Sequence, residues 1–199
     1  MSVAHAVPPH RMLQTDAEAA ARGMFSHRYA AFERMAPVFT TAGIEQRYTV
    51  KPLDWYLTDL GWPERNAAYL AGAQELFVDA ATRALAAAGC SAADVDTIVT
   101  ISSTGIATPS LEARVAGRMG FRADVERVPV FGLGCAGGVS GLALAGRLAS
   151  ARPGSRPTAS SGPVGSATVA STRARSRPRC PSPMPSRSMR PRWCYQGSS

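Results

Sequence analysis

An uninterrupted β-branched run, DTIVTISS at residues 96–103, is the feature that most constrains the fold. Such a run fits a strand that is buried on both faces, because a strand with one wet face would alternate with polar residues. A second strand is predicted at residues 128–131, and each strand is followed by a glycine and a helical pattern. The order helix, strand, helix, strand, helix predicts an α/β fold, with a mainly parallel sheet that helices cover on both faces.

Start and stop signals place the helices along the chain. Pro63 and Gly89 predict a helix over residues 62–88, and Ser110 predicts the cap of a helix over residues 111–119. The capping-box pattern TDAE at residues 15–18 predicts a helix that runs to about residue 35. Residues 4–14 and 43–50 are predicted to be extended.

Cys135 lies between the second strand and a helix predicted over residues 136–151. Gly132 and Gly134 permit the sharp turn that would expose this thiol. Unpaired backbone N–H groups and the positive end of the helix dipole favour the thiolate, the form that acts as a nucleophile. The alternative is a buried structural cysteine in a glycine-rich turn. Glycines at positions 137, 138 and 141 predict that another helix or a substrate approaches this helix closely.

Polar residues come after the first predicted strand, in the same position that Cys135 has after the second predicted strand. Ser103, Thr104 and Gly105 come directly after the β-branched run. Ligands of parallel sheets bind at the carboxyl ends of the strands, so we expect these residues and Cys135 to share one crevice. A hydroxyl pair beside a thiol favours the nucleophile over the structural cysteine.

Charge and cysteine content narrow the possible partners. The net charge is +8, but nine arginines lie after residue 151, where the chain has no acidic residue, so residues 1–151 do not favour a nucleic-acid partner. The four cysteines form no C-x-x-C pair, and neither a metal site nor a disulfide framework is predicted. Without a signal-peptide pattern or a long apolar span, a cytoplasmic protein is expected.

Several motifs together resemble the amino-terminal half of type III polyketide synthases, the chalcone and stilbene synthase relatives of the thiolase superfamily. These motifs are Gly134-Cys135-x-Gly-Gly, Ser103-Thr104-Gly105 with Pro109, Gly43-Ile44 with Arg47-Tyr48, and Pro8-Pro9. The resemblance covers about residues 1–156 and implies half of a thiolase-like αβα sandwich. It also implies an acyltransferase without a cofactor, in which Cys135 takes an acyl group from acyl-CoA and extends it with malonyl-CoA by decarboxylative Claisen condensation.

The resemblance assigns roles to further residues. It implies that Ser103, Thr104 and Gly105 bind substrate, that Arg34 contacts a CoA phosphate, and that family members form homodimers. It also implies a catalytic His and Asn contributed by the carboxyl-terminal half. The three histidines of this chain and its single asparagine all precede Cys135, so we expect no full turnover by this chain alone.

The composition changes abruptly after residue 156. Residues 157–199 contain no Leu, Ile, Phe, Asp or Glu, and 24 of these 43 residues are Ser, Pro or Arg. We therefore predict a synthase-like domain over residues 1–156 and a disordered tail over 157–199. A frameshift is the preferred origin of the tail, because GC-rich coding DNA yields these residues in a wrong frame.

Three hypotheses follow: a polyketide-synthase-like acyltransferase, an inert truncated fragment, and a basic-tailed binding protein. The other two reading frames past codon 156 distinguish them, since a Val/Leu-rich strand with a later His and Asn in one frame would establish the frameshift.

Overall fold

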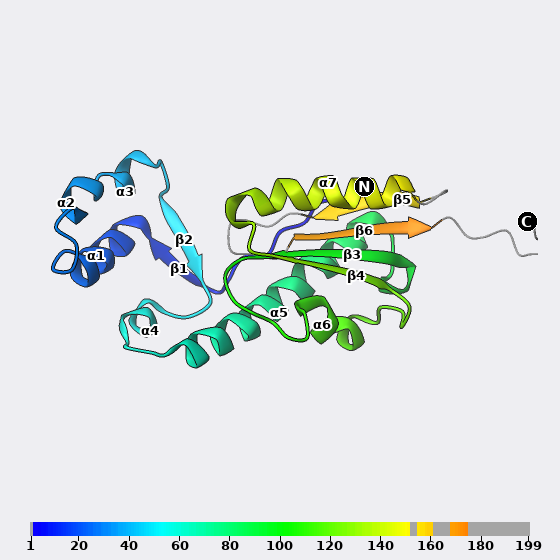
Figure 1. Ribbon diagram of the computed structural model, residues 1–199, viewed down its shortest axis with the longest axis horizontal. Helices are drawn as coiled ribbons and strands as arrows, with labels where there is room; N and C mark the ends of the chain where they lie inside the picture. Colours follow the sequence, from blue (N-terminus) through cyan, green and yellow to red (C-terminus); the bar gives the residue numbers. More distant parts are fainter. Residues whose placement is uncertain (1, 152–154, 161–167, 175–199) are drawn as a thin grey trace, which may run out of the picture.

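The computed structural model describes residues 2–151, 155–160 and 168–174 as a layered α/β body with a smaller lobe beside it (Figure 1). The central sheet has the strand order β4-β3-β6-β5, in which β5 is Ser155–Ser160 and β6 is Thr168–Ala174. Strands β3 (Val95–Ser102) and β4 (Glu126–Phe131) are parallel, as predicted. The turn between β4 and α7 lies at the end of the sheet nearer the smaller lobe.

Helices cover both faces of the sheet, which confirms the predicted αβα layering. Helices α5 (Trp62–Ala88) and α6 (Leu111–Met119) pack on one face, where Phe77 and Val115 meet Ile98 of β3. Helix α7 (Gly137–Ala151) covers the other face, where Ala145 meets Val99 and Ile101. β3 is almost entirely buried, since its alternate side chains enter two different cores.

The best-marked helix ends lie where the sequence predicts them. α5 and α6 have the predicted bounds, and each ends at a glycine in the left-handed conformation, Gly89 with φ 62° and Gly120 with φ 75°. A residue with a β-carbon is strained in this conformation, so these glycines stop the helices locally. A short 3₁₀ turn, η1 (Ala92–Asp94), follows α5 and leads into β3.

The prediction of one helix from residue 15 to residue 35 is wrong. The structure has α1 (Gln14–Phe25), α2 (Phe32–Met35) and α3 (Val38–Thr41), separated by turns. Aromatic side chains pack around the turn that follows α1, where the ring centroids of Phe25 and Phe32 are 6.4 Å apart. The Thr15 capping box is also wrong, because Leu13 is the N-cap of α1 and Thr15 already lies inside the helix.

Long-range contacts of Gln14 explain the earlier start of α1. Its backbone N–H donates to Glu45 O over 2.9 Å, and its buried side chain accepts a hydrogen bond from Arg47 Nε over 2.7 Å. These contacts tie α1 to the antiparallel pair β1 (His10–Leu13) and β2 (Gln46–Thr49), where extended chain was predicted. A short helix, α4 (Leu53–Leu57), then leads toward α5.

Residues 157–160 and 168–174 depart from the predicted irregular tail. β5 (Ser155–Ser160) pairs with β6 (Thr168–Ala174), and β6 pairs antiparallel with β3. Among the described strands only β3 and β4 are therefore parallel. Main-chain pairing explains the departure, because the second edge of β3 offers donors and acceptors that any extended segment can satisfy. The rest of the tail lies outside the described residues, and the frameshift stays a prediction.

Two glycines of α7 allow this helix to approach the sheet. A β-carbon on Gly137 or Gly141 would lie 2.6 Å from Ile101 side-chain carbons, whereas one on Gly138 would meet nothing within 4 Å. A close approach at these glycines was predicted, but the partner is a strand residue rather than a helix or a substrate. Across the residues that the structure describes, no helix is long and apolar enough to cross a membrane.

Candidate active site

Cys135 lies in a single 3₁₀ turn, η2 (Gly134–Ala136), between the end of β4 and the start of α7. The turn requires two left-handed glycines, Gly132 with φ 86° and Gly134 with φ 53°. The thiol is exposed. This exposure excludes the buried structural cysteine and leaves the thiol accessible to a reagent.

A hydrogen bond joins the ends of β3 and β4 beside the thiol. The Gly134 N–H donates to Ser103 Oγ over 3.0 Å, and the Gly132 N–H donates to the Ser102 carbonyl over 3.1 Å. Ser103 and the turn that carries Cys135 are therefore brought together, as the strand order predicts. Thr104 follows in the same loop and is exposed.

The start of α5 holds the other side of this loop. Asn66 Nδ2 donates to the Ile106 carbonyl over 3.0 Å, and the Ile106 N–H donates to Asn66 Oδ1 over 2.9 Å. A β-carbon on Gly105 would lie 2.4 Å from Tyr69 Cδ1. The structure thus gives Gly105 a packing role against α5, and its predicted contact with substrate stays a prediction.

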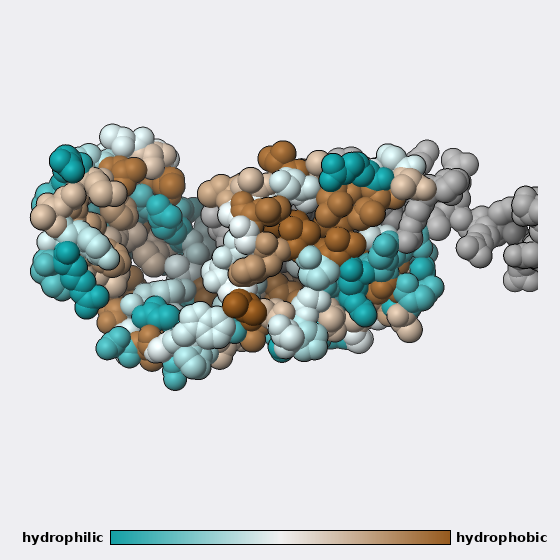
Figure 2. All heavy atoms as spheres, in the orientation of Figure 1, coloured by the Kyte–Doolittle hydropathy of each residue, from teal (hydrophilic) through white to brown (hydrophobic). Residues whose placement is uncertain are grey.

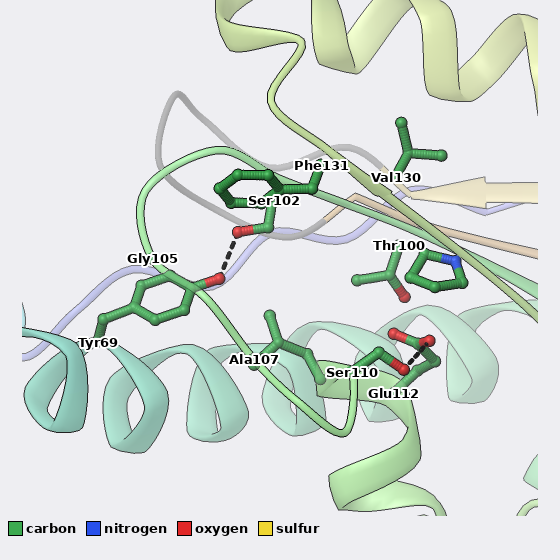
Figure 3. A pocket seen from close by; sticks show the side chains of 11 residues that line it. Tyr69, Thr100, Ser102, Gly105, Ala107, Ser110, Glu112, Val130 and Phe131 are labelled. Atoms are coloured by element: carbon green, nitrogen blue, oxygen red, sulfur yellow. Dashed lines mark hydrogen bonds between the residues drawn. The ribbon is translucent and has the colours of Figure 1, made fainter.

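A small pocket of about 60 Å³ lies behind the loop, on the α5 and α6 side of the sheet (Figure 3). Tyr69 forms a hydrogen bond with Ser102 at one end of the pocket, and Ser110 donates one to Glu112 Oε1 at the other. Glu112 is completely buried, and its Oε2 atom has no hydrogen-bond partner among the described residues. Thr100 Oγ1 is also buried and has no hydrogen-bond partner among the described residues. The pocket is therefore polar at its base and apolar along the walls to which Leu111 and Pro129 contribute.

Burial affects the ionisation of Tyr69. Loss of solvent around the phenol raises the pKa of Tyr69 above its ordinary value of 10.0, and the hydrogen bond with Ser102 partly opposes this effect. The Tyr69 hydroxyl therefore stays protonated at neutral pH and can donate a hydrogen bond.

Arg34 lies apart from this group of residues. It is exposed on α2, within the lobe of α1 to α3 that stands beside the sheet in Figure 1. Its role as a CoA contact stays a prediction. The described residues include no group of three or more His, Cys, Asp or Glu that could hold a metal ion.

Sequence reasoning did not find Asn66, Tyr69 or Glu112. All three lie on helices, where their spacing is that of ordinary helical residues, and their partners are reached only through the tertiary fold. One weak signal was available for Asn66, since asparagine competes for backbone hydrogen bonds and is unfavourable inside a helix.

Comparison with known proteins places these features in a family. The family model of chalcone and stilbene synthases, N-terminal domain, matches residues 60–179. This match begins and ends later than the expected range of 1–156. The chain is 46% identical over 145 residues to the 1,3,6,8-tetrahydroxynaphthalene synthase of Streptomyces peucetius subsp. caesius, which covers 72% of the chain and 37% of that relative. It is 32% identical over 158 residues to a putative chalcone synthase of Bacillus subtilis, a match that covers 77% of the chain and 43% of that relative.

Solved structures share the fold at lower identity. The 1,3,6,8-tetrahydroxynaphthalene synthase of Streptomyces coelicolor A3(2) superposes with a TM-score of 0.73 at 23% identity, over 86% of this chain and 56% of that one. Germicidin synthase from Streptomyces coelicolor gives a TM-score of 0.69, also at 23% identity, over 89% of this chain and 60% of that one. The chain thus spans less than half the length of the two sequence relatives. Its matched motifs, fold and family model show that the chain belongs to the chalcone and stilbene synthase family of type III polyketide synthases.

Proposed function

We propose that Cys135 is the acyl acceptor of a type III polyketide synthase reaction and that this chain carries the loading step. The observation that supports this role is the exposed thiol between β4 and α7, beside the Ser103 hydroxyl at the end of the neighbouring strand. Strand ends of this kind are where parallel sheets bind ligands. An accessible thiolate in such a place can attack a thioester.

The loading step is a thioester exchange. The Cys135 thiolate attacks the carbonyl carbon of an acyl-CoA, the bond from that carbon to the CoA sulfur breaks, and the CoA thiolate leaves and takes up a proton. The acyl group is then held as a thioester on Cys135. No oxidant, reductant or second substrate is needed.

Extension with malonyl-CoA needs hydrogen-bond donors in addition to the acylated thiol. Decarboxylation leaves an enolate, whose oxygen needs hydrogen-bond donors, and each such donor typically contributes about 10²- to 10³-fold in rate. Both polar atoms of Asn66 are engaged with the Ile106 backbone. His10 lies on β1, and His27 lies in the turn after α1. We infer that any extension by Claisen condensation depends on donors that these residues do not supply.

A CoA thioester is the proposed substrate class. The structural neighbour CsyB, with a TM-score of 0.70 and 21% identity, was solved in complex with CoA-SH. By analogy with such family members, we propose that Ser103 and Thr104 line the acyl site and that Arg34 contacts a CoA phosphate.

The test compares the chain with its Cys135→Ala variant. Intact-protein and peptide mass spectrometry after incubation with acyl-CoA should show one acyl group on Cys135 of the unchanged chain and none on the variant. A parallel assay with malonyl-CoA should show no decarboxylation above that of the variant.

Three outcomes contradict the proposal in different ways. Acylation spread over Cys90 and Cys135 alike would mean that Cys135 has no special reactivity. Absence of any acyl adduct would favour the inert fragment. Turnover of malonyl-CoA above the Cys135→Ala level would show that the chain supplies the enolate donors after all.

A further inference from the structure

The Asn66 side chain makes two hydrogen bonds with the loop after β3, one as the donor and one as the acceptor. Its amide donates to the Ile106 carbonyl and accepts from the Ile106 N–H, over 3.0 and 2.9 Å, across 40 positions of sequence. This is the pairing that a neighbouring strand would offer to a single residue. Only a side-chain amide has both a donor and an acceptor with this geometry, so the contact is specific to Asn or Gln.

Tyr69, one turn further along α5, adds a second anchor. Its hydroxyl forms a hydrogen bond with Ser102 Oγ, and its ring lies against Gly105 (Figure 3). A β-carbon on Gly105 would lie 2.4 Å from Tyr69 Cδ1 and 2.9 Å from Asn66 Oδ1. The loop after β3 therefore lies directly against α5 at Gly105.

The opposite side of the same loop contacts the turn that carries the thiol. Ser103 Oγ accepts from the Gly134 N–H over 3.0 Å, and the Ser102 carbonyl accepts from the Gly132 N–H over 3.1 Å. Gly134 is the first residue of η2, which contains Cys135. The backbone of this loop thus connects the hydrogen bonds from α5 with those to the backbone beside Cys135.

We propose that Asn66 and Tyr69 are positioning residues, which set the reactivity of Cys135 by fixing the loop that orients Gly132 and Gly134. This inference rests on the proposed function, because it concerns the same thiol. Neither side chain touches the thiol. Each acts through the position of Ser103 and the Gly134 N–H, and so through the placement of Cys135 at the start of α7.

The test measures the alkylation rate of Cys135 by iodoacetamide across a range of pH, using peptide mass spectrometry, beside the thermal midpoint of each variant. Asn66→Ala should lower the rate by about three- to tenfold, since small misplacements of a reacting group can cost up to about 10²-fold. It should also move the pH at which the rate is half-maximal, because the backbone N–H groups around the thiolate change position. Asn66→Asp keeps the acceptor but places an oxygen against the Ile106 carbonyl, and should behave like Asn66→Ala.

Gln74→Ala is the matched control. Gln74 is another amide on α5, but its Nε2 donates to Leu70 O within the same helix, over 2.9 Å. Its loss should leave the pH profile of Cys135 unchanged.

Tyr69→Phe removes only the hydroxyl and serves as the milder variant if Asn66→Ala does not fold. It should move the pH profile of Cys135 alkylation in the same direction as Asn66→Ala.

A lower thermal midpoint with an unchanged pH profile in both Asn66→Ala and Tyr69→Phe would overturn the proposal and leave these residues a structural role only. The proposed function fails by a different readout. If the unchanged chain takes no acyl group from acyl-CoA while the alkylation profile still responds to Asn66, the positioning role stands and the loading step does not.

Discussion

Tyr69 makes the pH dependence of stability predictable at the scale of one residue. Burial raises its pKa in the folded state above the ordinary value of 10.0. The unfolded chain therefore releases the phenolic proton at a lower pH than the folded chain. The contribution of Tyr69 to stability is fully present below pH 10.0 and is lost as the pH rises through the folded-state pKa.

Urea unfolding on both sides of pH 10.0 should show this loss directly. The free energy of unfolding of the unchanged chain should fall more steeply with pH than that of Tyr69→Phe, because the variant has no phenol to ionise at this site. An ultraviolet titration of tyrosinate provides the control, since Tyr69→Phe should remove one tyrosine that ionises above pH 10.0. Parallel stability curves would mean that the phenol is as well solvated in the folded chain as in the unfolded one.

Residue contacts across the sheet could be predicted only where strand order dictates them. The meeting of Ser103 with the turn of Cys135 follows from two parallel strands ending at one edge, and the hydrogen bond to Gly134 agrees with it. The contact of Asn66 with Ile106 depends on how far α5 extends past the sheet. Phe77 and Ala81 pack α5 onto the core, but a local pattern does not report where along the sheet the helix lies.

At the scale of secondary-structure elements, the close approach of α7 to β3 depends on Gly141. A β-carbon there would lie 2.6 Å from Ile101 Cγ1 and 2.9 Å from Ile101 Cδ1, inside a buried layer. Gly141→Ala should lower the free energy of unfolding by about 1–3 kcal/mol, the usual cost of overpacking a core. Chemical denaturation of the purified chain provides the measurement.

Gly146→Ala is the matched control in the same helix. A β-carbon on Gly146 would meet nothing within 4 Å. This variant should stabilise the chain by about 0.5–1 kcal/mol, because alanine is the better helix former. Equal effects of the two substitutions would mean that α7 does not lie on Ile101 as the structure shows.

Helix ends could be predicted from the sequence where a single nearby residue determines them. Gly89 and Gly120 end α5 and α6 at the predicted residues, because a left-handed glycine stops a helix without help from elsewhere. The long helix predicted to residue 35 is interrupted, because the chain turns between Phe25 and Phe32, and a capping pattern at residue 15 reports only where a helix starts. β6 could not be predicted, since its place beside β3 rests on main-chain pairing, which a side-chain pattern does not report.

At the scale of the whole molecule, large apolar side chains are exposed around the active-site turn. Phe131 is 57% exposed, Leu133 43%, Val139 76% and Leu142 40%. Figure 2 shows hydrophobic side chains gathered over the region that α7 and the neighbouring strands occupy in Figure 1. An apolar surface of this kind favours association between molecules.

We therefore expect the chain to associate nonspecifically rather than to form a clean homodimer. Sedimentation velocity should show mass that grows with concentration, and Val139→Lys should reduce this growth by placing a charge on the exposed surface. Val38→Lys serves as the control, because Val38 is 56% exposed on α3, away from α7. A stable, monodisperse dimer that Val139→Lys leaves intact would contradict this expectation.

The anchoring of the active-site loop by the start of α5 has a consequence for local unfolding. Helix ends open at a lower free energy than helix centres, and Asn66 and Tyr69 are the fifth and eighth residues of a 27-residue helix. Pro63, at the start of α5, restrains this end, since its fixed φ already suits a helix. When the first turns of α5 fray, the loop loses its anchors while the sheet and the rest of α5 remain folded. We therefore expect the thiol site and the first turns of α5 to open together on warming, before the core does.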